Sequence, residues 1–485
     1  MACFVAAFAA ALDLSLNGKT IKRVAASELV PIAYPVPLPG GGKGRGLSLG
    51  ELFPLLSDAW RLEAKSASAS RAWADDELGE RLFDLYLVQS ASGSWDLVVS
   101  GDRLAAVERI DLAAEPLAED DLQFWVAWEG VPELKAEVAR FARGHGVSIS
   151  ATEVPNTQSK LVAVARGGGR LPDLVMVQSD YVPSLARMGL LQSVDYLRTD
   201  DLVAKGFEAF RHDGRYWALP FYFDAQLVFY RSSLAGSPPR PDWTLEELEA
   251  RARALKGRVE APLACNLYSA YWLLPFMAGF GKDAILDADG GITVDDAPTA
   301  RALDKLLGLC DEGLLKPLER DAMVSWFAAG KAAYILSGSY SIPEFERVGL
   351  DFGVAPYPVV AATGMPAAPM LDFKGLALSR RTTKPVLARR LAQYLTSPGV
   401  QARFTSALSK LPSSRAAWEL ARGSNRYFAQ LSRSYDIGLA VPPADAYGAF
   451  KNVMWKLLRL VVTRQMAVPE ALATAQRLVD ENLSP

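Results

Sequence analysis

The stretch that decides the fold is LPDLVMVQ, residues 171–178, a run of apolar residues without polar alternation. A strand that is buried on both faces, at the centre of a parallel sheet, has this character. Asp180 follows it and opens the segment DYVPSLARMG, where a short polar side chain suits the N-cap of a helix. We therefore predict a central parallel strand, followed by a helix that Asp180 caps.

The segments before this strand alternate between strand and helix patterns. Apolar runs at 122–128 and 147–154 predict strands, and residues 131–146 place Val131, Leu134, Val138 and Phe141 on one helical face. Such alternation is typical of a parallel sheet covered by helices. Ligands of open parallel sheets bind beyond the carboxyl ends of the strands, which predicts a site after 122–128 and 171–178.

Length and composition limit the class of protein. The chain has 485 residues, half of them hydrophobic, which predicts about three packed domains and excludes a disordered protein. The net charge is −3, so the chain lacks the positive field of a nucleic-acid binder. Only two histidines occur, and neither lies in a spaced ligand pattern, so we expect no metal site and no cofactor.

The N-terminal residues 1–12 are small and apolar and include A-x-A-like triplets, as an export signal does, although no basic residue precedes them. The alternative is a first buried strand or helix, and Cys3 could be a lipid-attachment cysteine. We predict a signal segment at 1–12 and an exported protein that is periplasmic or extracellular, with a membrane tether as one option.

Residues 13–118 contain strand-like runs separated by turns and predict a small β-rich domain. Within it, the Pro- and Gly-rich stretch 35–46 lacks the spacing of a phosphate-binding loop, so we expect a flexible loop. The acidic stretch 115–121 predicts a linker. Later in the chain, 216–231 is a long extended segment that carries seven aromatic residues.

Taken together, these strings resemble the extracellular solute-binding proteins of bacterial ABC importers, in the carbohydrate-binding group related to maltose-binding protein. The similar strings are FWVAWEG, TQSKLVAVARGGGRLPDLVMVQSDYVPSLARMGLLQSVD, DGRYWALPFYFDAQLVFYR, MVSWFAAGKAAYILSGSYS and FGVAPYPVV, in order over most of 122–415. The resemblance implies an α/β fold, a two-lobed periplasmic-binding-protein clamp of type II, preceded here by the β-rich domain. It also implies a non-enzymatic monomer that delivers a carbohydrate to a membrane permease.

The resemblance divides the chain into two lobes joined by strands that cross between them twice. We expect lobe I at 122–228 plus 357–412, and lobe II at 229–356 plus 413–485. Closure of the lobes on a ligand in the cleft would be the signal that a transporter reads.

A sugar site needs aromatic plates together with carboxylates and amides, because sugars have apolar faces edged by hydroxyl groups. Each candidate also has a structural alternative, such as core packing, a helix cap or a solvent-facing amide. Tyr222 is chosen as the cleft-facing aromatic of its segment because of its hydroxyl. The candidates from the strand ends and from the crossing segment are Trp128, Glu129, Gln158, Asp180, Tyr181, Tyr222, Asp224, Tyr271 and Trp272.

Two later segments complete the candidate site. In the similar family the turn at Gly338, Ser339 and Tyr340 faces the ligand, and Gly338 permits a close approach. The returning strand has Asp372 and Lys374 where the family usually has small residues. These two could form an ion pair at the rim or contact a charged ligand.

The N-terminal region weakly resembles the oxidoreductase molybdopterin-binding fold, in the stretches 46–56 and 95–112. That fold's metal-ligating cysteine has no equivalent, since no cysteine lies between Cys3 and Cys265. We therefore expect a scaffold without the cofactor, used as a spacer or docking module.

Two other functions remain open at this point. One is an exported glycan hydrolase with paired carboxylates such as Asp180 and Asp224, which would have to flank one bond. The other is a ligand-binding sensor that docks on a membrane receptor through its N-terminal domain.

Overall fold

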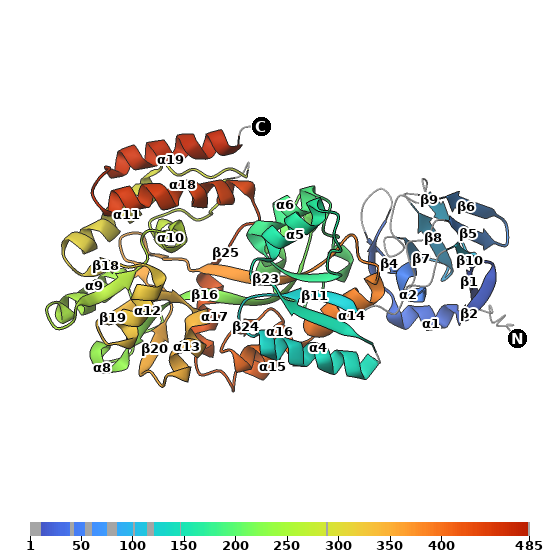
Figure 1. Ribbon diagram of the computed structural model, residues 1–485, viewed down its shortest axis with the longest axis horizontal. Coiled ribbons are helices and arrows are strands. Elements are labelled where there is room, and N and C mark those ends of the chain that lie inside the picture. The colour runs from blue at the N-terminus through green and yellow to red at the C-terminus, as the bar shows by residue number, and fades with distance from the viewer. Residues whose placement is uncertain are drawn as a thin grey trace, which may run out of the picture.

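The computed structural model shows three bodies in a row, with the N-terminal domain at one end (Figure 1). No helix among the described residues is long and apolar enough to cross a membrane. The residues that the structure describes are 11–38, 43–53, 61–74, 85–99, 102–113, 121–145, 147–287 and 290–483. Most of the predicted signal segment and of the predicted linker therefore lies outside the described residues.

The N-terminal domain consists of two five-stranded sheets that enclose one apolar core, in which Leu14, Leu47 and Leu97 are fully buried. The first sheet has the order β2-β1-β10-β5-β6, with β1 parallel to β10. Its strands are β1 (Ala11–Leu16), β2 (Lys19–Ala25), β5 (Arg61–Ser66), β6 (Ser70–Ala74) and β10 (Val107–Ala113). The second sheet has the order β3-β4-β7-β8-β9, with β3 (Tyr34–Pro37), β4 (Lys43–Ser48), β7 (Tyr86–Gln89), β8 (Trp95–Val99) and β9 (Asp102–Leu104). Short helices α1 (Ala26–Leu29), η1 (Val30–Ile32) and α2 (Leu49–Leu52) complete the domain.

Two expectations for this region need correction. The stretch 35–46 is not a flexible loop over its length, because β3 and β4 pair as an antiparallel hairpin with Pro35 opposite Arg45. Proline fits there because β3 is an edge strand and needs fewer backbone donors. In addition, Ala11 and Leu12 of the predicted signal segment belong to β1, where Leu12 is buried.

Lobe I, as defined by the structure, is built on the parallel strands that the sequence predicted. β11 (Leu122–Val126) pairs in parallel with β12 (Ile149–Glu153) and with β13 (Leu174–Gln178). All of β13 except its last residue is buried, as its unbroken apolar run requires. The covering helices and short elements are α4 (Val131–His145), α5 (Thr157–Arg166), η3 (Ser179–Tyr181), α6 (Val182–Arg187), η4 (Asp195–Leu197), α7 (Ala204–Ala209), β14 (Arg211–His212), β15 (Arg215–Tyr216), α14 (Pro385–Leu395) and α15 (Pro398–Ala407).

Strand β16 (Leu219–Arg231) runs without interruption through both lobes, and 12 of its 13 residues are buried. Its first half pairs with β23 (Met370–Leu378), from Leu219 opposite Leu376 to Ala225 opposite Leu371. Its second half pairs with β19 (Ala332–Gly338) and β20 (Phe352–Ala355). Since β23 also pairs with β13, the main-chain hydrogen bonds run without a break from one lobe into the other.

Lobe II is built around β17 (Ala261–Cys265), which pairs in parallel with β18 (Leu315–Pro317) and β19. Helix α9 (Leu245–Leu255) begins after Thr244, whose side chain accepts a hydrogen bond from the Glu247 amide. Helices α18 (Asp445–Val462) and α19 (Val468–Leu483) form an antiparallel pair on the outside of this lobe (Figure 1). The other elements are α8 (Ser232–Ala235), η5 (Ala270–Trp272), α10 (Leu274–Gly279), α11 (Ala297–Asp311), α12 (Arg320–Ala328), η6 (Ser339–Ser341), α13 (Ile342–Arg347), β21 (Val359–Val360) and β22 (Met365–Pro366).

The returning chain divides between the lobes differently from the predicted bounds. Tyr357, Val360 and Ala367, from the segment assigned to lobe I, are buried in the core of lobe II, where Tyr357 lies 5.8 Å from the ring of Phe276. The segment therefore joins lobe I only at β23. The remaining elements are β24 (Leu411–Pro412), α16 (Arg415–Ala421), α17 (Phe428–Ile437) and β25 (Leu439–Ala440), of which β24 and β25 extend the crossing strands.

The crossing strands leave little room for larger side chains, which gives a test of the fold. A Cβ atom added at Gly375 in β23 would lie 2.6 Å from Phe210 and 2.8 Å from Ala218. We expect Gly375→Ala to destabilise the chain by about 1–3 kcal/mol, measured by thermal unfolding.

Gly308 provides the matched control for this substitution. It lies in helix α11 with no atom within 4 Å of an added Cβ, so Gly308→Ala should stabilise by about 0.5–1 kcal/mol. Equal melting temperatures for the two variants would contradict the packing described around β23.

Candidate functional site

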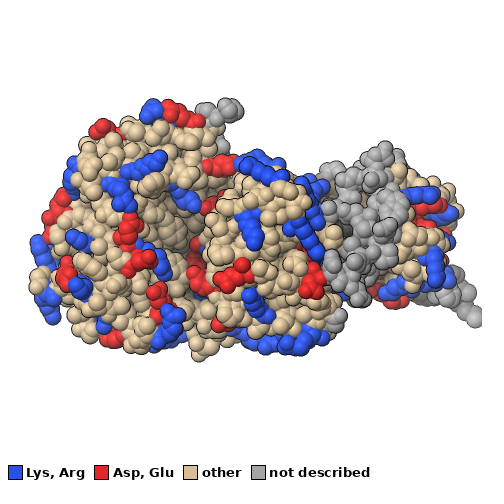
Figure 2. All heavy atoms as spheres, in the orientation of Figure 1, with Lys and Arg blue, Asp and Glu red and all other residues tan. Residues whose placement is uncertain are grey.

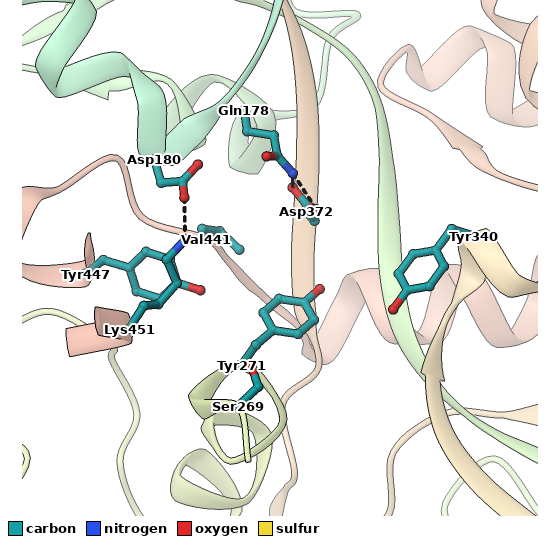
Figure 3. A pocket seen from close by; sticks show the side chains of 9 residues that line it. All are labelled: Gln178, Asp180, Ser269, Tyr271, Tyr340, Asp372, Val441, Tyr447 and Lys451. Atoms are coloured by element: carbon teal, nitrogen blue, oxygen red, sulfur yellow. Dashed lines mark hydrogen bonds and ion pairs between the residues drawn. The ribbon is translucent and has the colours of Figure 1, made fainter. Parts of the chain in front are cut away.

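Two cavities lie side by side between the lobes, where a hollow is visible on the surface (Figure 2). The inner cavity has a volume of about 350 Å³ and the outer cavity about 640 Å³. The inner cavity is lined by Gln178, Asp180, Ser269, Tyr271, Tyr340, Asp372, Val441, Tyr447 and Lys451 (Figure 3). The outer cavity is lined by Gln158, Asp180, Ser184, Arg187, Ala444, Asp445, Gly448, Ala449, Lys451, Asn452, Asn482 and Leu483.

The inner cavity lies at the carboxyl ends of parallel strands from both lobes. Gln178 ends β13 and Asp180 follows it, while Tyr271 and Tyr340 follow β17 and β19 of lobe II. Strands of an open α/β sheet place the residues that follow them at this edge. Of the two strand ends expected from the sequence, the one after 171–178 lies at the inner cavity, whereas Trp128 and Glu129 after 122–128 line neither cavity.

Asp372 supplies a carboxylate that β23 carries into the cavity. The Gln178 Nε2 atom lies 3.1 and 3.4 Å from its two oxygens (Figure 3). The Lys374 Nζ atom lies 2.6 Å from Oδ2. Burial raises the pKa of the Asp372 carboxyl, and the Lys374 ammonium opposes that rise. Each carboxylate oxygen can accept more than one hydrogen bond, so Asp372 can still accept one from a ligand hydroxyl.

Three tyrosines provide ring surfaces and hydroxyl groups. Burial raises the pKa of Tyr340 to about 12 and that of Tyr271 and Tyr447 well above the ordinary value, so all three keep their phenolic proton at neutral pH. Tyr271 is fixed by Gln226 of β16, whose Nε2 donates to the Tyr271 carbonyl at 2.7 Å while its Oε1 accepts from the Met370 amide. The crossing strand therefore sets the position of the Tyr271 ring.

Two ion pairs join the lobes across the cavities. The Lys451 Nζ atom of α18 lies 2.5 Å from Asp180 Oδ2 after β13. Arg187 at the end of α6 makes a bidentate pair with Asp445 at the start of α18, at 2.5 and 2.9 Å. Helix α18 thus contacts lobe I through charged groups while its apolar face packs in lobe II.

A buried charge network lies at the crossing strand. Lys410 is fully buried, and its Nζ atom lies 2.7 and 2.8 Å from the Asp224 oxygens and 3.1 Å from Glu129. Burial alone would raise the pKa of Asp224, but the ammonium groups of Lys410 and Lys374 lower it by more. The Ser339 hydroxyl also donates to Asp224, at 2.7 Å, so a group of lobe II joins the network.

The structure brings five of the predicted site residues to the cavities. Asp180, Tyr271, Tyr340 and Asp372 line the inner cavity, and Gln158 lines the outer one, where it donates to the Ser184 hydroxyl at 3.0 Å. Asp180 is not a helix cap, because neither η3 nor α6 has a side-chain cap, and its carboxylate pairs with Lys451 instead.

Other predicted residues do not line either cavity. The Lys374 Nζ atom lies over the Trp128 ring, 5.0 Å from the ring centre, and the ring centres of Trp128 and Tyr181 are 6.5 Å apart. Trp272 packs in the lobe II core, edge-on to Tyr271. A Cβ atom at Gly338 would lie 2.2 Å from the Tyr340 ring, so the glycine permits that ring position.

Tyr222 does not face the cleft. Its side chain is fully buried in the lobe I core, with the ring 5.3 Å from Phe404, and its hydroxyl has no hydrogen-bond partner among the described residues. Tyr222 shares its face of β16 with Asp224 and Gln226, but both faces of this strand are buried, so polarity alone does not show which of its side chains reach the cleft.

Sequence reasoning missed the contributions of α18 to the site. Tyr447 and Lys451 are one turn apart on this helix, and Asn452 follows in the outer cavity. These residues lie on a helix far along the chain and reach the cavity because that helix packs beside it. Gln178, by contrast, ends the quoted strand and could have been included.

Among the described residues, no group of three or more His, Cys, Asp or Glu side chains is placed to hold a metal ion. The site therefore consists of aromatic rings, hydroxyls, amides and paired charges between two hinged lobes. This combination is that of a two-lobed cleft lined by groups that suit a polar ligand.

Comparison with known proteins places the chain in a family. Residues 136–422, more than half of the chain, match the bacterial extracellular solute-binding proteins, and the chain belongs to this family. This is a family of binding proteins, not of enzymes, so the hydrolase alternative is set aside. The match does not include the N-terminal sheets, and the resemblance of that region to the molybdopterin-binding fold stays a prediction.

Individual relatives agree with this placement. The maltotriose-binding protein of Pyrococcus abyssi is 30% identical over 235 residues, 45% of this chain and about half, 48%, of that protein. The maltodextrin-binding protein MdxE of Bacillus subtilis is 24% identical over 56% of this chain and 68% of its own length. The maltose/maltodextrin-binding domain of Bdellovibrio bacteriovorus, solved with maltotriose, matches with a TM-score of 0.65 at 22% identity, over 75% of this chain and all of that domain. The structural match confirms the maltose-binding-protein-like α/β fold.

The buried network gives a test of the crossing region. Lys410→Met would keep the side-chain stem but leave the Asp224 charge buried without its main partner, so we expect a loss of about 3–5 kcal/mol in unfolding free energy. Thermal or urea unfolding measures this loss.

The second variant is the double substitution Lys410→Met with Asp224→Asn, which removes the unpaired charge. It should be more stable than Lys410→Met alone, because the cost lies in the unpaired carboxylate. A single variant as stable as the unmodified chain would contradict this account of the network.

Proposed function

We propose that this protein captures a carbohydrate of the maltooligosaccharide class outside the cytoplasm and delivers it to the permease of an ABC importer. The observation that carries this proposal is the inner cavity, where three tyrosines and two carboxylates from both lobes meet at the strand ends. No residue of the site is assigned a catalytic role.

The chemistry of the cavity suits a neutral sugar. The rings of Tyr271, Tyr340 and Tyr447 offer apolar surface for the face of a pyranose, and their protonated hydroxyls donate or accept hydrogen bonds. Asp180 and Asp372 accept hydrogen bonds from sugar hydroxyls, while Lys451 and Gln178 donate. Because Lys374 already pairs with Asp372, it is not available as a free charge for an anionic ligand.

Closure of the lobes couples ligand capture to delivery. Tyr271, Tyr340 and Lys451 belong to lobe II, whereas Gln178 and Asp180 belong to lobe I, so a ligand contacts both groups only when the lobes are together. Contacts made only in the closed state shift the population towards it. The permease then distinguishes a loaded protein from an empty one by its shape.

The names of the relatives support the sugar class. Proteins that bind maltotriose and maltodextrin are 30% and 24% identical to this chain over the matched segments. The family description supports a place outside the cytoplasm.

Ligand-induced stabilisation tests the proposed function directly. A ligand at a hundredfold excess over its dissociation constant should stabilise the folded chain by about 2.7 kcal/mol, which a thermal-shift assay detects. We expect maltose, maltotriose and maltotetraose to raise the melting temperature, and to be recovered chemically unchanged. No shift with any of these sugars would contradict the proposal.

The ring of Tyr271 provides the residue-level prediction. Tyr271→Ala should weaken maltose binding by about 1 kcal/mol or more, since an aromatic contact is worth that much beyond its buried area. Isothermal titration calorimetry measures the affinity. Trp326→Ala, a half-buried aromatic on α12 that lines neither cavity, is the control and should leave the affinity unchanged.

A further inference from the structure

The inner and outer cavities share only two lining residues, Asp180 and Lys451. These two form the ion pair between the lobes, with 2.5 Å between Nζ and Oδ2. The Asp180–Lys451 ion pair therefore separates a small cavity of about 350 Å³ from a larger polar cavity of about 640 Å³. A ligand that occupies both cavities has to pass between Asp180 and Lys451.

The two partners differ in how far they can move. The Asp180 side chain is 16% exposed and lies on a short stem after a buried strand, so its position is fixed by lobe I. The Lys451 side chain is 38% exposed and long, and its ammonium also lies 5.2 Å from the Tyr447 ring centre. The ion pair breaks by movement of the Lys451 side chain, which leaves the Asp180 carboxylate free to accept a hydrogen bond from a ligand hydroxyl.

A second ion pair, on the side of the outer cavity, holds helix α18 near Asp180. Arg187 and Asp445 both line the outer cavity and join the same two parts of the chain, the region after β13 and helix α18. Asp445 and Lys451 are six residues apart, which is about 9 Å along a helix. Any displacement of α18 that widens the passage also strains this second pair.

We propose, on the basis of the proposed function, that the Asp180–Lys451 pair makes the protein select short ligands over long ones. A sugar confined to the inner cavity leaves the pair intact, and its closed complex keeps the contribution of the pair. A longer sugar that extends into the outer cavity breaks the pair and loses that contribution. The volume of the inner cavity lies at the lower end of the range for small-molecule sites, as expected for a short ligand.

The size of the effect follows from the exposure of the pair. A partly exposed ion pair contributes up to about 1 kcal/mol, so its loss changes the relative affinity by roughly two- to fivefold. The ratio of affinities for a long and a short ligand isolates this contribution, because any general effect on lobe closure applies to both ligands and cancels.

The test measures the affinities of maltose and maltotetraose by isothermal titration calorimetry, in the full chain and in Lys451→Met, at low salt. Lys451→Met keeps an unbranched side chain but removes the charge, and we expect the maltotetraose-to-maltose affinity ratio to rise about two- to fivefold. Lys456→Met is the matched control on the same helix, because Lys456 is exposed and lines neither cavity.

Salt provides a second readout that does not depend on a substitution. High salt screens exposed charges, so it should raise the same ratio in the unmodified chain but not in Lys451→Met. A ratio that is the same in both proteins and at both salt concentrations overturns the selection by length and leaves the proposed function standing. If neither sugar binds to either protein, the proposed function fails, and the selection that rests on it fails too.

Discussion

The rest of the structure depends on β16, a strand that has to be continuous through two lobes and buried in both. Its main chain is satisfied by β23 in one half and by β19 and β20 in the other. A charged residue at its centre is costly to bury, and Asp224 is tolerated because Lys410 and Ser339 satisfy its oxygens. The polar contact of Asp224 with Lys410 and Ser339 thus joins the two lobes within a buried strand.

The same strand determines where the ligand groups lie. Gln226, two residues after Asp224, holds the backbone of Tyr271 on one side and that of Met370 on the other. On the other side of the crossing, Asp372 on β23 lies directly opposite Asp224 in the register. The two carboxylates are close, which is consistent with the Asp224 charge contributing to the raised pKa of Asp372. The crossing strands therefore join the lobes and also position Tyr271 and Asp372, which line the inner cavity.

Much of the fold could be predicted from the sequence because its signals are local. The unbroken apolar run at 171–178 identifies a central strand, and Thr244 marks a helix start through its own hydroxyl. Asp180 and Tyr340, which line the inner cavity, could be proposed from the sequence because they follow strands. Tyr222 was assigned wrongly because its ring packs in the lobe I core, although Asp224 and Gln226 lie on the same face of β16. Lys451 was missed because its place depends on how α18 packs.

The N-terminal domain takes its place from lobe I alone. Strand β3 packs against η4, α2 packs against α14, and the Tyr86 ring lies 6.4 Å from that of Tyr196. These elements all lie on the side of lobe I that faces away from lobe II (Figure 1). Arg389 of α14 is buried at this junction, 6.0 Å from the Tyr196 ring. The proposed movement about the crossing strands would break none of these contacts, so the N-terminal domain would move together with lobe I.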